Sequence, residues 1–440
     1  MGRSVLSVLM LALACAALPA AGELQNVELG GSLSITGWYY NYDSIPTTAY
    51  IDQFTRLSVR GDFTDNVTAF VEAASYDAWG EDFRSGFLGG GDFRADSTDD
   101  VEIYQAYVEA RELWGAPLTL RAGRQELAFG SEWLVGDNSD SSPVFGLSFD
   151  ALRLTLAQDT FSLDLVAAKL AEGMSGFGGD DTDFYMVYFS HTGVEDHVFD
   201  AYWMFVRDDA ATAAFETDLH TLGLRAAGAF GALDYEVEAA WQTGGVEGLF
   251  SACPAGFGTA DTDYGAPAAA ATVGYTLECP WTPRIFASFA YLGGGDPDRS
   301  PFSNDRTLPF NRLFSDVEYT EFLAFTDMTN ILFYGVGVEA APTETVALSL
   351  LVSHLEADEA MLGPGGWLTR DEIPTNLGWE AALSAEYQYS DDLGFYFTYA
   401  HFFGADGLGG SYVIYNGLFP WQGDGDDDYD VVYLGSTISF

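Results

Sequence analysis

Basic residues are scarce in this chain, where 17 Lys and Arg stand against 66 Asp and Glu among 440 residues. The formal net charge is −49 at pH 7, and Lys169 is the only lysine. Because nucleic acid is itself a polyanion, this charge argues against nucleic acid as a partner. A charge of this size is tolerated where the acidic side chains lie in solvated loops.

Long hydrophobic runs are also missing after the first 22 residues, since no later stretch approaches the roughly 18 apolar residues of a transmembrane helix. Aromatic residues nevertheless make up 15% of the chain. An aromatic-rich chain without a helical span fits a transmembrane β-barrel, whose lipid-facing band is bordered by aromatic girdles. A secreted β-sandwich or β-helix is the alternative.

The N-terminal 22 residues have the features of a secretory signal peptide. A basic start is followed by an apolar run over 5–18 and by small residues, and we expect cleavage after Gly22, with Ala21 as the alternative. The mature chain, 23–440, is then expected to form one domain. This signal directs the chain out of the cytoplasm, which fits a protein of the bacterial outer membrane.

The mature chain is made of segments in which apolar and polar residues alternate, as in β-strands. Trp379, Ala381 and Leu383, for example, alternate with polar residues such as Glu380 and Ser384. This pattern predicts about eighteen strands of a membrane barrel. Their expected bounds are 29–40, 52–63, 67–78, 101–112, 117–129, 147–157, 160–171, 182–192, 196–207, 217–229, 233–244, 266–277, 282–293, 330–341, 345–356, 377–389, 393–404 and 429–440.

The connections between these segments are short and long in turn, as in barrels with short periplasmic turns and long outer loops. The expected fold class is therefore all-β, a transmembrane antiparallel up-and-down β-barrel that ends on an aromatic residue, Phe440. We expect this residue to engage the barrel-assembly machinery, and the outer face to contact outer-membrane lipid. A barrel of this size encloses an aqueous channel, which the long loop 294–329 could narrow by folding inward.

Two cysteines remain in the mature chain, and this strand assignment separates them. Cys253 falls in an outer loop and Cys279 in a periplasmic turn. The wall then places them about 25 Å apart, far beyond the roughly 7 Å between Cα atoms that a disulfide can bridge. No disulfide is expected.

Strand parity predicts which charged residues face the lumen. The expected cations are Arg56, Arg60, Arg111, Arg121, Arg153 and Arg225, and the expected acids are Glu72, Glu109, Glu236, Glu238, Glu380 and Glu386. A wall of mixed charge can steer dipolar or neutral solutes as well as ions. Alternatively, each arginine is a structural partner of a nearby acid.

Three blocks of residues resemble the alginate-export family of bacterial outer-membrane proteins. The first is Gly123-Arg124-Gln125-Glu126-Leu127-Ala128-Phe129-Gly130 with Leu134-Val135-Gly136 and Phe149-Asp150-Ala151-Leu152-Arg153-Leu154. The second is Leu377-Gly378-Trp379-Glu380 with Tyr387-Gln388-Tyr389-Ser390-Asp391 and Tyr399-Ala400-His401-Phe402-Phe403. The third is Gly293-Gly294-Gly295-Asp296 with Phe310-Asn311-Arg312-Leu313-Phe314.

The resemblance implies a monomeric barrel with an arginine-lined pore that passes a polyanionic polysaccharide. By motif it assigns Arg124, Glu126, Asp150 and Arg153 to the pore or its constriction. The family usually has arginine at two positions that are here Trp133 and Leu147, and the loss of these cations weakens the case for alginate itself.

We therefore expect a passive channel for a hydrophilic solute, most simply an alginate-type polysaccharide exporter. The alternatives are a general diffusion porin for small solutes and a surface adhesion or structural barrel. An enzyme is not expected, because Ser190-His191 and Ser353-His354 are neighbours on strands and point to opposite faces. No cofactor or metal is expected. The acidic tract 423–430 lacks the Glu that closes an EF-hand and is interpreted as a solvated loop.

Overall fold

The computed structural model describes most of the chain. The described residues are 24–42, 45–64, 66–79, 101–137, 146–171, 180–210, 215–250, 259–295, 307–322, 328–360, 374–408, 412–414, 417–419 and 428–440.

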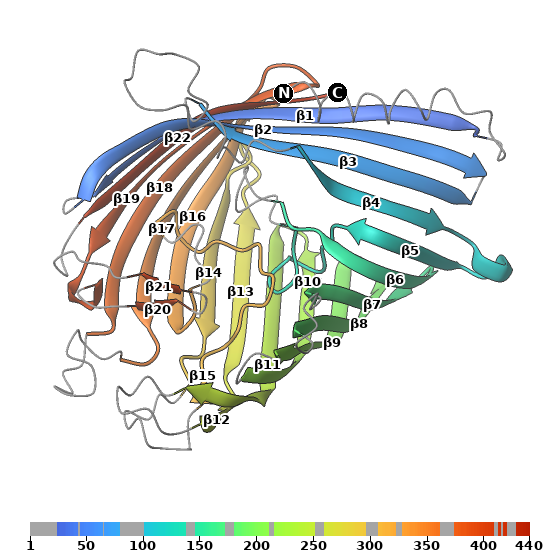
Figure 1. Ribbon diagram of the computed structural model, residues 1–440. Coiled ribbons are helices and arrows are strands. Elements are labelled where there is room, and N and C mark those ends of the chain that lie inside the picture. Colours follow the sequence, from blue (N-terminus) through green and yellow to red (C-terminus); the bar gives the residue numbers. More distant parts are fainter. Residues whose placement is uncertain are drawn as a thin grey trace, which may run out of the picture.

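Eighteen strands form a closed antiparallel barrel (Figure 1). They are β1 (Asn26–Tyr42), β2 (Ile45–Thr64), β3 (Val67–Ala78), β4 (Glu102–Ala110), β5 (Leu118–Gln125), β6 (Phe149–Gln158), β7 (Phe161–Ala171), β8 (Asp180–Val194), β9 (His197–Ala210), β10 (Phe215–Phe230), β11 (Leu233–Phe250), β13 (Pro267–Thr276), β14 (Arg284–Leu292), β16 (Ile331–Thr343), β17 (Val346–Ala357), β18 (Asn376–Gln388), β19 (Leu393–Gly404) and β22 (Tyr429–Ser439). The strand prediction is confirmed, and the bounds of β3 and β19 are the predicted ones.

The barrel closes where β1 pairs with β22, in a register that sets Trp38 opposite Tyr433. Closure leaves no free edge in the wall, so the backbone groups of every wall strand have partners on both sides. Four further short strands are present, of which β12 (Thr259–Tyr264) pairs antiparallel with the end of β11 and so extends the wall sheet. β12 also pairs in parallel with β15 (Thr307–Leu308), and β20 (Tyr412–Ile414) and β21 (Gly417–Phe419) form a hairpin. Among the described residues, no helix has the length and apolar character needed to span a membrane.

The outer face of the barrel is apolar. Leu29, Leu57, Val336 and Leu434 each leave half or more of their surface exposed there. In water such a surface would be unfavourable, but in a bilayer it contacts hydrocarbon. The alternate residues of the same strands point inward, which explains why the pattern has a period of two.

The lumen contains an apolar core of its own. Two non-strand segments enter it, 126–137 after β5 and 309–322 after β15, and Figure 1 shows them inside the ring of strands. Leu127 and Phe310 in these segments are fully buried against wall residues such as Phe184 and Phe402. The predicted strand 117–129 therefore ends early, at Gln125, because the chain leaves the wall there.

Candidate functional site: a charged lumen crossed by two inward segments

The two inward segments pair with each other inside the barrel. The N–H of Phe314 donates to the carbonyl of Leu134 at 2.9 Å, and the N–H of Gly136 donates to the carbonyl of Phe314 at 2.8 Å. Asp316 N–H adds a bond to the carbonyl of Glu132 at 3.0 Å. Because these backbone groups satisfy one another, the segments can cross the lumen without strand partners from the wall.

Two wall side chains hold the second segment. Gln242 of β11 bonds to both the N–H and the carbonyl of Asn311. Further round the wall, the Glu380 carboxylate of β18 accepts the N–H groups of Glu321 and Phe322, each at 2.9 Å. The segment is thus fixed near both ends.

Aromatic contacts fill the space between the segments and the wall. Trp133 donates its indole N–H to the hydroxyl of Tyr319 at 2.8 Å and stacks on Phe310. Phe314 packs edge-on against Phe149 and Phe184, each at a centroid distance of 5.0 Å. Trp133 therefore supports the packing of the inward segments at a position where the family usually has arginine.

The six arginines that parity assigns to the lumen all face it, and each has an acidic partner. Arg121 lies 2.7 Å from Glu109, and Arg153 lies 2.8 Å from Asp164. The remaining pairs are Arg56–Glu126 at 3.1 Å, Arg60–Asp62 at 3.3 Å, Arg111–Glu109 at 3.6 Å, and Arg225 with Asp200 and Glu236, both at 2.7 Å.

The guanidinium of Arg56 also lies between two aromatic rings, 5.0 Å from the centroid of Phe54 and 4.5 Å from that of Tyr104. Its partner Glu126 is the first residue of the first inward segment. This contact ties the segment to β2. Stacking and ion pairing together hold the guanidinium in one orientation.

Two of the residues assigned by motif are not in the lumen. Arg124 and Asp150 pair with each other at 2.8 Å on the outer face, on the opposite parity to Arg121 and Arg153. The motif assigned both residues to the pore, and strand geometry shows why they point outward. Positions three apart on a regular strand, such as Arg121 and Arg124, point to opposite faces. These two residues therefore do not line the pore.

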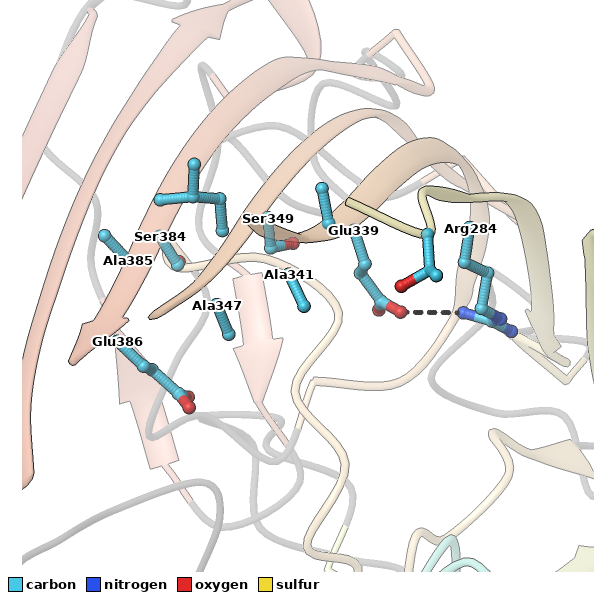
Figure 2. Close-up of a pocket in the computed structure, with 11 residues that line it drawn as sticks. Arg284, Glu339, Ala341, Ala347, Ser349, Ser384, Ala385 and Glu386 are labelled. Atoms are coloured by element: carbon cyan, nitrogen blue, oxygen red, sulfur yellow. Dashed lines mark hydrogen bonds and ion pairs between the residues drawn. The ribbon is translucent and has the colours of Figure 1, made fainter. Parts of the chain in front are cut away.

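One lumen cation was missed by the sequence analysis. Arg284 of β14 bonds to Asp234 at 2.6 Å and to Glu339 at 3.2 Å. It borders a cavity of about 370 Å³ whose wall is made mostly of small side chains, and Figure 2 shows Arg284 and Glu386 at opposite ends of that wall. Parity within the predicted strand 282–293 would have placed Arg284 inward beside Phe286.

Three carboxylates meet where the inward segments pair. Oxygens of Glu132, Asp137 and Asp316 all lie within 4.8 Å of one another, and they are the residues that a metal ion could engage in the described part of the chain. No sequence pattern pointed to this group, because its members come from two different loops. Most of the acidic tract 423–430 lies outside the described residues, as does Cys253.

An apolar outer belt, a closed wall and a charged lumen together define a channel-forming β-barrel of the bacterial outer membrane. The family model for alginate export matches residues 29–408, and the chain belongs to this family. It is an outer-membrane channel for hydrophilic solutes. A search of curated proteins finds no match.

Solved structures of outer-membrane proteins from Pseudomonas aeruginosa share this fold. OccK8 (OprE) is 14% identical, with a TM-score of 0.56, covering 96% of this chain and 100% of that one. OpdQ is 12% identical, with a TM-score of 0.58, covering 95% and 99%. OccK11 (OpdR) is 12% identical, with a TM-score of 0.54, covering 95% and 98%.

Proposed function

We propose that the channel passes neutral hydrophilic solutes, saccharides in particular, by passive diffusion. The supporting observation is that the lumen arginines are already neutralised by protein carboxylates. A uronate carboxylate would have to displace a protein acid at Arg121 or Arg153, and it would then lie beside that acid. The cost of breaking such pairs disfavours a polyanion relative to a neutral sugar.

Several lumen acids have partners other than a basic side chain. Asp52 accepts the indole N–H of Trp38 at 2.8 Å, and Glu380 accepts two backbone N–H groups. For Glu386 no partner is found among the described residues. The wall therefore carries more negative than positive charge, which favours cations over anions among charged solutes.

Export of an alginate-type polyanion is the second candidate, and family membership favours it. Recordings from single channels in planar bilayers under a salt gradient separate the two. A cation-selective reversal potential without block by oligomannuronate supports the proposed function. Anion selectivity with block by oligomannuronate contradicts it and supports polyanion export. Absence of conductance contradicts both and favours a structural or adhesion role.

We further propose that the channel works as a monomer and has no catalytic activity. Ser190 faces the lumen whereas His191 lies on the opposite parity, and Ser353 and His354 are separated in the same way. Neither pair can therefore act as nucleophile and base. Cross-linking in detergent tests this, because a monomer should keep the mass of a single chain after the treatment.

The N-terminal 22 residues are proposed to be removed during export, which leaves 23–440 as one domain. Phe440 follows β22 with an exposed side chain, and we propose that the barrel-assembly machinery recognises it. N-terminal sequencing of the mature protein tests the cleavage position. Deletion of Phe440 is expected to lower the yield of assembled barrel.

A further inference from the structure

An aromatic strip lines one side of the lumen. It consists of Trp38 and Tyr40 of β1, Tyr50 of β2, and Tyr429 and Tyr433 of β22. The register sets Trp38 opposite both Tyr50 and Tyr433, so these three side chains share the inner face of the wall. Sequence analysis did not single them out.

Four of the five rings stack on one another, and Tyr433 lies tilted against Trp38 with planes at 42°. Trp38 and Tyr40 lie 5.8 Å apart between centroids with planes at 7°, and Tyr40 and Tyr50 lie 6.1 Å apart at 16°. Tyr429 extends the stack from Tyr40 at 6.3 Å, and Tyr433 contacts Trp38 at 4.7 Å. Such near-parallel rings hold each other in place, so the strip is a rigid surface.

One edge of the strip packs on the second inward segment, where Phe322 lies 5.2 Å from Tyr429 between ring centroids and where Tyr40 and Tyr433 contact the same apolar core. The other edge, at Tyr50, lies away from that core. Among the described residues, the apolar core of these segments includes no side chain from β2, β3 or β4. Tyr50 leaves 38% of its surface exposed, whereas Trp38, at the centre of the stack, leaves 5%. A solute that passes along this side of the barrel therefore meets Tyr50 first and then the partly exposed Tyr40.

Polar groups flank the rings. The Trp38 indole is oriented by Asp52 at 2.8 Å, and the Tyr433 hydroxyl donates to Glu321 at 3.2 Å. The nearest lumen cation along β2, Arg56, is held by Glu126. Asp52 is buried and Glu321 is engaged by Tyr433, so these acids orient the rings from behind. The surface thus offers flat rings that carry tyrosine hydroxyls at their edges, with no unpaired positive charge in the described residues.

We propose that the aromatic strip is a binding site for neutral oligosaccharides, in which a sugar ring lies against Tyr50 and Tyr40. A saccharide ring has a flat face of C–H groups and a rim of hydroxyls, and this combination matches apolar rings bordered by a few polar groups. The proposal rests on the proposed function and names the solute class for it.

Block of the ion current by maltohexaose tests the site. In planar bilayers, the full-length channel is expected to show brief interruptions of current that increase with maltohexaose concentration. Tyr50→Ala and Tyr40→Ala are each expected to weaken the block constant by about tenfold, the upper end of what one aromatic contact supplies. Tyr50→Phe keeps the ring and is expected to keep most of the block.

Tyr39→Ala is the matched control, because Tyr39 lies between Trp38 and Tyr40 but faces outward. Unchanged block in Tyr50→Ala, or equal weakening in Tyr39→Ala, overturns the site. A channel that conducts ions but is never blocked by maltohexaose overturns the site and leaves the channel itself intact. Block by oligomannuronate alone overturns it in favour of polyanion export, and absence of conductance overturns site and channel function together.

Discussion

The side chain of Gln242 forms two hydrogen bonds with the backbone of Asn311, one in each direction, and both are 2.7 Å long. Gln242 is fully buried and also donates to Thr221 at 3.1 Å. The amide thus takes the place of a neighbouring strand for one residue of the second inward segment. Few other side chains carry a donor and an acceptor in this arrangement.

Gln242→Leu is expected to release this end of the inward segment. The substitution leaves a backbone N–H and a carbonyl of Asn311 without partners, which costs about 1–3 kcal/mol for each buried group. We expect higher and noisier single-channel conductance together with a lower temperature of barrel unfolding on heat-modifiability gels.

Ser288→Ala is a suitable control for this variant, because Ser288 faces the lumen on β14 and bonds to Thr272 of β13. Its conductance is expected to match that of the wild type. Equal conductance in Gln242→Leu and the wild type would show that the Asn311 contact does not set the pore width.

The contact of Glu380 with the other end of the second inward segment is expected to behave in the same way. Glu380→Gln replaces one of two acceptor oxygens with a donor that faces a backbone N–H of Glu321 or Phe322. One bond is lost and two donors oppose each other, so the segment should detach intermittently. Closing and opening events in single-channel traces report this detachment, and Glu386→Gln on the same face of β18 should not produce them.

Much of the wall could be predicted from the sequence, because a period of two is a local property of each strand. The lumen arginines followed from the same parity. Arg124 and Asp150 were misplaced because the motif was transferred without applying parity, which already separates Arg121 from Arg124. The correct placement was therefore available from the spacing alone.

The inward segments could not be predicted in the same way. The sequence indicated that 294–329 is long enough to fold inward, and its longest described stretch, 307–322, lies largely in the lumen. Its pairing with 126–137 depends on bonds such as Phe314 to Leu134, between residues far apart in the chain. No local pattern encodes such a contact, since it exists only once the barrel has closed.

Acidification is expected to stabilise the docked state of the second inward segment, in which Glu321 is buried. Burial raises the pKa of the Glu321 carboxyl, and the hydrogen bond from Tyr433 opposes this only in part. Since the docked state binds the proton more tightly than the released state, docking is favoured at low pH and weakens as pH rises through the raised pKa.

Opening events are therefore expected to become rarer from neutral pH toward about pH 5, still above the ordinary pKa of a glutamate. Glu321→Gln should remove this contribution to the pH dependence while its amide still accepts from Tyr433. If the variant and the wild type show the same pH dependence, other lumen acids are responsible.

Neutralising two lumen arginines should increase cation preference. Arg121→Gln with Arg153→Gln removes two positive charges beside Glu109 and Asp164, which remain charged. The reversal potential in a salt gradient is expected to move toward the value of a cation-selective channel. Arg124→Gln removes a positive charge from the outer face and should leave the potential unchanged. A shift in the control equal to that in the double variant would remove Arg121 and Arg153 from the conducting path.

The exposed thiol of Cys279 reports which end of the barrel faces the periplasm. Cys279 is free and lies in the short turn between β13 and β14. In a Cys253→Ser background, a membrane-impermeant maleimide should label it only after the outer membrane is permeabilised, because short turns of such barrels face the periplasm. Cys279→Ser in the same background serves as the unlabelled control. Labelling in intact cells would place the short turns outside and reverse the direction in which a solute meets the aromatic strip.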